Sequence, residues 1–384
     1  MTQSTRPPRL PLPRLAPARL LGPLMLALLV AVPSASAARP RWVTVQSLHH
    51  AREFHTATLL GNGQVLVAGG YGFSGFMSSA ELFDPRSKHW RAAQALKVAR
   101  IGATATLLSS GNVLVAGGAN LSNRYLNDAE LFSPASASWV SAAPLVAARD
   151  NQTATLLRDG RVLVCGGLSR LSRAVRSAEV YNPATNSWTP APSMKITREH
   201  HTATLLRDGR VLVVGGEDQV AGNFPFRNSV EIYNPTTNSW SGAASMHSAR
   251  ANHTATLLRD GRVLVSGGGE RQSGFTSSAE IYSPSKNRWT RVAHMRTARG
   301  FDTATLLLNG RVLVTGGFGN FDALASSEIY DPKSNRWIST AGLRTRRAHQ
   351  TATLLFNGDV LVTGGALYSG VVLSSAELYL PSGH

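Results

Sequence analysis

The fold of this chain is decided by a stretch of sequence that recurs along it. Residues 198–240 read REHHTATLLRDGRVLVVGGEDQVAGNFPFRNSVEIYNPTTNSW. The same order of residue types surrounds seven Gly-Gly doublets, at Gly69-Gly70, Gly117-Gly118, Gly166-Gly167, Gly215-Gly216, Gly267-Gly268, Gly316-Gly317 and Gly364-Gly365. The seven tryptophans of the chain recur with the same period, at intervals of 48, 49, 49, 52, 49 and 48 residues: Trp42, Trp90, Trp139, Trp188, Trp240, Trp289 and Trp337. A period near fifty residues predicts an array of small sheets, one for each copy.

Each copy predicts four short β-strands. In the first copy, the apolar runs 56–60 and 65–68 flank Asn62-Gly63, and an Asn-Gly, Asp-Gly or Ser-Gly pair stands at this point in every copy. Such a pair favours a hairpin, because both turn residues tolerate positive φ. The Val-Leu-Val runs suit a strand that is covered on both faces. The pattern predicts an all-β, seven-bladed β-propeller in which each blade is a four-stranded antiparallel sheet.

The N-terminal tryptophan predicts how the ring closes. Trp42 stands one period before Trp90 with no first three strands ahead of it, and the seventh copy ends at 381–384 without a tryptophan. We therefore expect the N-terminal strand to pair into the last blade, which leaves no broken blade in the ring.

The copies resemble the kelch motif. The fourth copy shows the resemblance most fully, at Gly215-Gly216, Glu231, Tyr233, Asn234-Pro235, Thr237-Asn238 and Trp240. The resemblance covers essentially the whole chain after residue 37. The repeat sequences Thr-Ala-Thr-Leu-Leu and Asp-Gly-Arg-Val-Leu-Val are most similar to those of bacterial kelch proteins and of the kelch portion of galactose-oxidase-like proteins. It implies a seven-bladed kelch propeller over residues 38–384.

The first 37 residues read as a secretory signal peptide. Four arginines precede the apolar stretch 20–32, and the small residues 35–37 offer a cleavage site before Ala38. That stretch is shorter than the roughly 20 residues that cross a bilayer. We expect a secreted or periplasmic protein with no transmembrane segment in its mature chain.

The net charge indicates which classes of partner are favoured, and the cysteine content indicates whether a disulfide can form. The chain has a formal net charge of +17, and the signal segment holds four arginines and no acidic residue, which leaves 17 − 4 = +13. This charge favours an anionic glycan or cell-surface polymer, or a protein, and an exported chain has little access to nucleic acid. Cys165 is the single cysteine, so it forms no internal disulfide and we interpret it as a small buried filler.

The ligand is expected on one face of the propeller, which we call the variable-loop face. The second-to-third-strand and blade-to-blade connections lie there, and the former span 15 residues from Gly216 to Glu231 against 11 or 12 in the other copies. Loops that are free of turn geometry are where function is usually placed. The candidate ligand-binding residues are aromatic, arginine and histidine side chains of this face: Tyr71, Phe73, Tyr125, Arg170, Arg173, Arg176, His200, Phe224, Phe226, Arg271, Phe318, His349 and Tyr368.

Two further sets of residues recur near the inner strands. Each copy has one arginine before its inner strand and one glutamate two residues before its third-strand aromatic residue, and this one-to-one ratio favours a structural ion pair over an anion site. The two positions before each inner strand vary, and His201, His253 and Asp302 among them have the donor types of a zinc or copper site if consecutive blades bring them together. We expect no metal and no other cofactor.

The sequence predicts a recognition protein rather than an enzyme. We expect an exported, monomeric module that binds a protein or an acidic glycan through the variable-loop face. The alternatives are a periplasmic sugar-processing enzyme, similar to a mutarotase or epimerase, and a galactose-oxidase-like oxidase. An enzyme predicts a deep polar pocket with a carboxylate or histidine of strongly shifted pKa.

Overall fold

The computed structural model describes residues 39–122, 124–169, 172–218, 225–270 and 274–381. The chain divides into two compact units, residues 1–37 and 38–384, and every described residue belongs to the second. The predicted signal peptide therefore lies outside the described residues. Within the described ranges the regular structure is all β-strand, with no helix that could cross a membrane.

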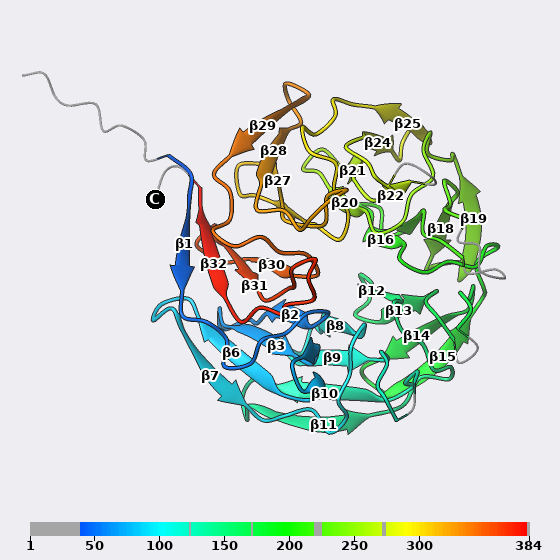
Figure 1. The fold of residues 1–384 in the computed structure, drawn as a ribbon. Helices are drawn as coiled ribbons and strands as arrows, with labels where there is room; N and C mark the ends of the chain where they lie inside the picture. Colours follow the sequence, from blue (N-terminus) through cyan, green and yellow to red (C-terminus); the bar gives the residue numbers. More distant parts are fainter. Residues whose placement is uncertain (1–38, 123, 170–171, 219–224, 271–273, 382–384) are drawn as a thin grey trace, which may run out of the picture. The chain divides into compact units, whose positions relative to one another are not determined.

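The strands form seven four-stranded antiparallel sheets arranged in a ring (Figure 1). Blades 1 and 2 comprise β2 (Thr56–Leu59), β3 (Val65–Ala68), β6 (Ala80–Asp84) and β7 (His89–Ala93), then β8 (Thr104–Leu107), β9 (Val113–Ala116), β10 (Ala129–Ser133) and β11 (Ser138–Ala142). Blades 3 and 4 comprise β12 (Thr153–Leu156), β13 (Val162–Cys165), β14 (Ala178–Asn182) and β15 (Ser187–Ala191), then β16 (Thr202–Leu205), β17 (Val211–Val214), β18 (Val230–Asn234) and β19 (Ser239–Ala243).

The remaining three blades complete the ring. Blades 5 and 6 comprise β20 (Thr254–Leu257), β21 (Val263–Ser266), β24 (Ala279–Ser283) and β25 (Arg288–Arg291), then β26 (Thr303–Leu306), β27 (Val312–Thr315), β28 (Ser327–Asp331) and β29 (Arg336–Thr340). Blade 7 comprises β30 (Thr351–Leu354), β31 (Val360–Thr363), β32 (Ala376–Leu380) and β1 (Arg41–Val45). The inner strands β2, β8, β12, β16, β20, β26 and β30 each contact their two neighbours around the ring. The predicted fold is confirmed.

Strand β1 closes the ring as predicted. It pairs with β32 so that Trp42 faces Tyr379, and Figure 1 shows the N-terminal strand lying along the C-terminal one. The indole N–H of Trp42 donates to the carbonyl oxygen of Ala341 in blade 6 at 2.8 Å. Trp42 is therefore buried between blades 6 and 7, as each other tryptophan joins its own blade to the one before.

The hydrophobic core consists of seven layers, one between each pair of neighbouring blades. The second strands supply fully buried Val-Leu-Val runs, which confirms that they are covered on both faces. Across each blade the third-strand aromatic residue contacts the fourth-strand tryptophan, with ring centroids 5.0 to 5.2 Å apart. Burial of these rings stabilises each blade junction by roughly 2 to 3 kcal/mol for each large side chain.

The inner hairpins form where they are expected, with a different turn. Gly63 has a φ of +86°, whereas Asn62 does not have a positive φ. The N–H of Gly63 donates to Leu60 and the N–H of Leu60 donates to Gln64, which is a three-residue loop with glycine in the left-handed position. The asparagine instead accepts the N–H of Gln64 through its side chain.

Two small hairpins on the variable-loop face were not predicted. The strands β4 (Tyr71–Gly72) and β5 (Gly75–Phe76) pair in blade 1, and β22 (Gly269–Glu270) and β23 (Gly274–Phe275) pair in blade 5. They rise from the loop after the Gly-Gly doublet, so this loop carries its own structure in these two blades.

Ring closure through β1 predicts that Trp42→Ala destabilises the protein by about 3 to 5 kcal/mol, because a buried indole leaves a cavity. Trp240→Ala is the matched control, since Trp240 is more exposed and its indole N–H donates to Pro192 at the surface. Urea unfolding should show the larger loss for Trp42→Ala, and removal of residues 39–48 should lower the melting temperature further. Equal effects of the two tryptophan changes would contradict closure through β1.

Candidate functional site

The arginine of each copy is buried in a structural ion pair. Its guanidinium lies 2.6 to 3.4 Å from the glutamate of the same blade, in the pairs Arg52–Glu81, Arg100–Glu130, Arg149–Glu179, Arg198–Glu231, Arg250–Glu280, Arg299–Glu328 and Arg347–Glu377. The same guanidinium donates to the carbonyl oxygen of the first glycine of the doublet, for example Arg52 to Gly69 at 2.8 Å. The predicted structural role is confirmed, and these arginines are not available to an anion.

The residues before the inner strands form a ring around the propeller axis, which we call the axial ring. It comprises Phe54, Gly102, Asn151, His200, Asn252, Phe301 and His349, all with φ between +50° and +61°. Their backbones are linked across blades, since Asn252 donates to His200, Phe301 to Asn252 and His349 to Phe301 at 3.1 to 3.4 Å. Positive φ is uncommon for phenylalanine and histidine, so the structure around the axis imposes this conformation.

Aromatic side chains gather on one side of the axial ring. His349 stacks on Phe54 with ring centroids 3.9 Å apart and meets Phe301 and Phe318 edge-on at 4.7 and 5.1 Å. Tyr368 continues the group, 5.8 Å from Phe318. These five residues, which we call the aromatic cluster, come from the start of blade 1 and from blades 6 and 7. Edge-to-face contacts of this kind hold the rings in defined positions.

Carboxylates gather on the other side of the ring. Asp150, Glu199, Glu217 and Asp218, which we call the acidic cluster, are all buried. His200 lies among them, with its Nδ1 2.8 Å from Glu217 Oε1 and 3.6 Å from Glu199 Oε2. Arg227 lies 3.2 Å from Asp218, which also accepts the hydroxyl of Thr197.

The acidic cluster has perturbed pKa values. Burial raises the pKa of Glu199 to about 7, and the neighbouring carboxylates add to this against the charge of His200. Burial likewise raises the pKa of Asp150 to about 6. Burial lowers the pKa of His200, but its hydrogen bond with Glu217 and the charges of the cluster outweigh this, so its pKa lies above the ordinary value. Titratable groups with pKa values of about 6 and about 7, gathered in one place, are typical of a functional site.

The comparisons with known proteins agree with this architecture. Residues 42–268 match the family model of the Attractin/LZTR1 beta-propeller, and residues 200–379 match that of the KLHDC2/KLHL20/DRC7 Kelch-repeats domain. The chain belongs to the kelch-repeat β-propeller family. No curated protein matches its sequence.

A solved structure of similar fold is a fungal alcohol oxidase of the AA5 family in complex with copper. It is 18% identical, with a TM-score of 0.73, and the match covers 90% of the kelch chain and 77% of the oxidase. At this identity the likeness shows the fold alone.

The predicted ligand-binding residues have different surroundings in the kelch propeller. Tyr71, Phe73, Arg173, Arg176 and Tyr368 are exposed, and His200, Phe226, Phe318 and His349 are half-buried. Tyr125 is buried, with its hydroxyl donating to Ser172, so it covers the blade and presents no open ring face to a ligand. Arg170, Phe224 and Arg271 lie outside the described residues. Three of these residues, His200, Phe318 and His349, contact the ring of Phe301 near the axis, and Tyr368 contacts Phe318.

The residues that the metal hypothesis combined are not brought together. His201 turns its Nε2 to Thr153 of blade 3 and His253 turns its Nε2 to Thr202 of blade 4, both at 2.9 Å. Each therefore joins its own blade to the preceding one, and Asp302 occupies the same type of slot at the next junction. No three His, Cys, Asp or Glu side chains in the described ranges are placed to hold a metal ion.

The acidic cluster was missed by the sequence analysis, although a signal for it was present. Asp150 and Glu199 each follow the ion-paired arginine, and Glu217 follows the Gly-Gly doublet. These two positions face each other in an isolated β-bridge in every blade. A comparison of these two positions between the copies would have found blade 4 as the one with two acids.

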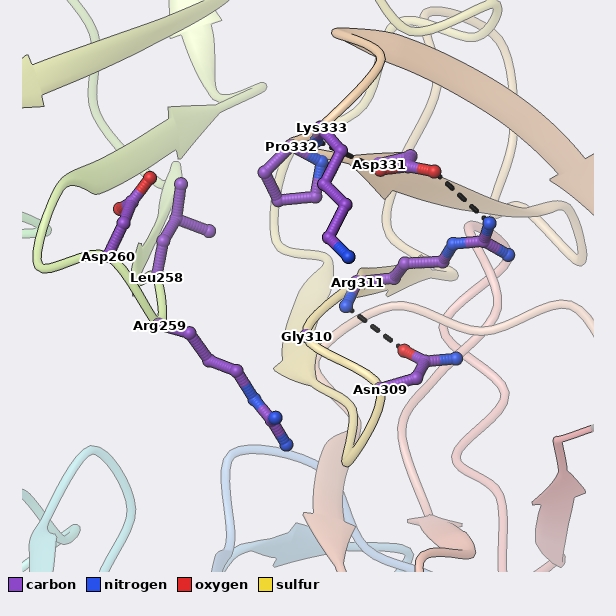
Figure 2. Close-up of a pocket in the computed structure, with 9 residues that line it drawn as sticks. All are labelled: Leu258, Arg259, Asp260, Asn309, Gly310, Arg311, Asp331, Pro332 and Lys333. Atoms are coloured by element: carbon purple, nitrogen blue, oxygen red, sulfur yellow. Dashed lines mark hydrogen bonds and ion pairs between the residues drawn. The ribbon is translucent and has the colours of Figure 1, made fainter.

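The opposite face carries cavities at the blade junctions. Figure 2 shows one of about 620 Å³ between blades 5 and 6, lined by Arg259, Asp260, Arg311, Asp331 and Lys333 among others. The guanidinium of Arg311 is held by Asp331 at 3.1 Å. Cavities with equivalent linings occur at the junctions of blades 3 and 4, 4 and 5, and 7 and 1, so this cavity arises from the repeat and does not distinguish one blade.

The buried ion pairs predict that Glu179→Gln destabilises the propeller by about 3 to 5 kcal/mol, because Arg149 loses its countercharge. Asp159→Asn is the control, since its pair with Arg161 is about 40% exposed and is worth about 1 kcal/mol or less. Urea unfolding at pH 7 measures both. A loss for Glu179→Gln as small as that of the control would contradict the structural role.

The raised pKa of Glu199 predicts a pH-dependent difference in stability. The folded protein holds this proton up to about pH 7, whereas the unfolded chain releases it near the ordinary value of 4.5. The wild type therefore loses stability as the pH rises through this window, and Glu199→Gln does not. In urea unfolding, the free energy of unfolding of the variant should rise relative to that of the wild type from pH 5 to pH 8. The exposed Asp322→Asn should show no such trend.

Proposed function

We propose that this kelch propeller is an exported recognition module that binds a protein partner through its variable-loop face. The observation that carries the proposal is a group of exposed aromatic side chains on that face. Phe73 and Phe321 are more than 90% exposed, Tyr368 is 69% exposed, and Tyr71 and Phe54 are each about 40% exposed. Aromatic side chains that extend from a rigid scaffold are typical anchors of protein interfaces.

The exposed aromatic residues lie in one sector of the ring. Phe54, Tyr71 and Phe73 belong to blade 1, Phe321 to blade 6 and Tyr368 to blade 7, and these blades are consecutive because β30 contacts both β2 and β26. A cavity of about 600 Å³ beside Phe321 is lined by the loop 319–326 together with Arg296 and Arg346. Apolar anchors, a concavity and a charged rim on neighbouring blades fit a peptide segment of a partner.

The site also favours a second candidate, an acid–base enzyme acting on sugars. Its support is the group of titratable side chains near neutrality, above all Glu199 with a pKa of about 7 beside His200. Such groups suit proton transfer at physiological pH. Anomer exchange of free sugars followed by NMR, with Glu199→Gln as the inactive variant, would separate this candidate from pure recognition.

A galactose-oxidase-like activity has less support. Cys165 Sγ lies 3.4 Å from Thr153 Oγ1 and 3.8 Å from His201 Nε2, inside the junction of blades 3 and 4. Burial raises the pKa of its thiol. The cysteine therefore fits the filler role that its place in the repeat predicts, and not that of a residue crosslinked to tyrosine.

The recognition proposal is tested with the purified protein against a displayed peptide library and a glycan array. We expect selected peptides, with affinity falling roughly 30-fold or more in Phe73→Ala/Phe321→Ala, since interface anchors contribute about 2 kcal/mol or more. Phe356→Ala is the control, because Phe356 is a phenylalanine that is 68% exposed in a first-to-second-strand turn on the opposite face. Binding that survives the double change, or ligands found on the glycan array alone, would overturn the proposal.

The proposed export is tested separately. N-terminal sequencing of the secreted protein should begin at Ala38.

A further inference from the structure

Blade 4 places two carboxylates directly opposite each other. The isolated bridges that join the arginine loop to the Gly-Gly loop pair Glu199 with Glu217. The other six bridges pair residues of which at most one is charged: Glu53–Tyr71, Ile101–Ala119, Asp150–Leu168, Ala251–Gly269, Gly300–Phe318 and Ala348–Ala366. Like charges at directly opposed positions are destabilising. The fold does not need this pair, because six blades form the same bridge without it.

The charges around this bridge do not balance. When ionised, Asp150, Glu199, Glu217 and Asp218 carry four negative charges, and the cations among them are protonated His200 and Arg227. The nearby Arg149 and Arg198 are each held by the glutamate of their own blade. Among the residues that the structure describes, the buried negative charges therefore exceed these cations by two, and an unpaired buried charge is costly.

Asp150 supplies a second and independent indication of a ligand. The residue is 7% exposed, and its Oδ1 is enclosed without a hydrogen-bond partner among the described residues. Its charge interacts with His200 and Glu199, so it faces the same space. A buried acceptor with no donor indicates that a donor is missing from the site.

Aromatic rings border the acidic cluster across the axis. Phe301 meets His200 edge-on with ring centroids 6.3 Å apart, and it also contacts Phe318 and His349. A histidine thus joins the carboxylates to the aromatic rings, and carboxylates and aromatic rings are both favourable to an organic cation. A divalent metal fits less well, because no three of the described acidic and histidine side chains converge as metal ligands.

We propose that the acidic cluster, through Asp150, Glu199 and Glu217 and next to the His200–Phe301 ring contact, is a binding site, which we call the pocket, for the cationic side chain of a lysine or arginine presented by the partner. The inference rests on the proposed recognition function and names the chemistry that its central subsite takes. The cation supplies the N–H donor that Asp150 lacks, and it separates the opposed charges of Glu199 and Glu217.

The pocket is tested by calorimetry with the purified protein and three probes, N-acetyl-arginine amide, N-acetyl-lysine amide and the neutral N-acetyl-citrulline amide. We expect the cations to bind and citrulline not to, and the arginine and lysine arms show which cation fits. Binding should release protons near pH 6.5 and tighten from pH 5.5 to pH 8, because the cation binds the ionised form of carboxyl groups whose pKa values are about 6 and 7.

Variants make the test specific to this pocket. Asp150→Asn and Glu199→Gln should each weaken cation binding about tenfold, the factor for one lost charge-assisted hydrogen bond. Asp159→Asn removes an exposed carboxylate in a first-to-second-strand turn on the opposite face and should leave cation binding unchanged. Melting temperatures check that each variant folds. Equal binding of citrulline, or cation binding that survives both pocket changes, would overturn the pocket.

The outcomes separate this inference from the function on which it rests. If the protein binds arginine or lysine but no peptide, the pocket stands and the recognition proposal fails. If selected peptides bind through Phe73 and Phe321 but tolerate Asp150→Asn and Glu199→Gln, the recognition proposal stands and the pocket is wrong. Selected peptides that lose affinity when their single basic residue becomes glutamine would support both.

Discussion

The buried arginine of each blade is the interaction on which this propeller depends. Its guanidinium binds the glutamate and the first glycine carbonyl of its own blade, while its backbone oxygen accepts the N–H of the second glycine in the preceding blade. Gly365 donates in this way to Arg52, so the same bond closes the ring. The doublet must be glycine, because both residues have positive φ and a Cβ on either would lie within about 3 Å of a backbone oxygen. One arginine thus fixes two blades, and its charge is compensated within the fold.

This division of tasks explains where function can lie. The residues that hold the ring, from arginine to glutamate, are buried and fully used, so changes to them act on stability first. The positions next to them contribute little to closure: residue 199 follows Arg198 and residue 217 follows Gly216. Glutamate at both creates repulsion that the other bridges avoid. A locally unfavourable interaction that the fold itself does not require is typical of a functional site.

Repetition made the fold predictable and the site difficult to predict. Seven copies defined the strands, the closure by Trp42 and the Arg–Glu pairs, because any error in one copy is corrected by the others. The hairpins form where they were predicted, but the loop length was not predicted, since Asn-Gly permits two loop lengths and only backbone geometry decides between them. The acidic cluster depends on residues from different copies meeting at the axis. Asp150 and Glu199 are 49 residues apart, and only the position of blade 3 beside blade 4 makes them neighbours.

The variable-loop face carries exposed positive charges in its loops and buried negative charges at the propeller axis. The chain has a formal net charge of +17, and exposed arginines such as Arg124, Arg173 and Arg176 lie in the outer loops, whereas the axis holds buried carboxylates. Salt screens the exposed charges within about 10 Å, but it screens the buried ones much less. A free small cation therefore meets a repulsive rim before an attractive centre. A partner with an acidic surface around one basic side chain would be attracted both by the exposed arginines and by the buried carboxylates, which is the charge pattern that the proposed protein partner requires.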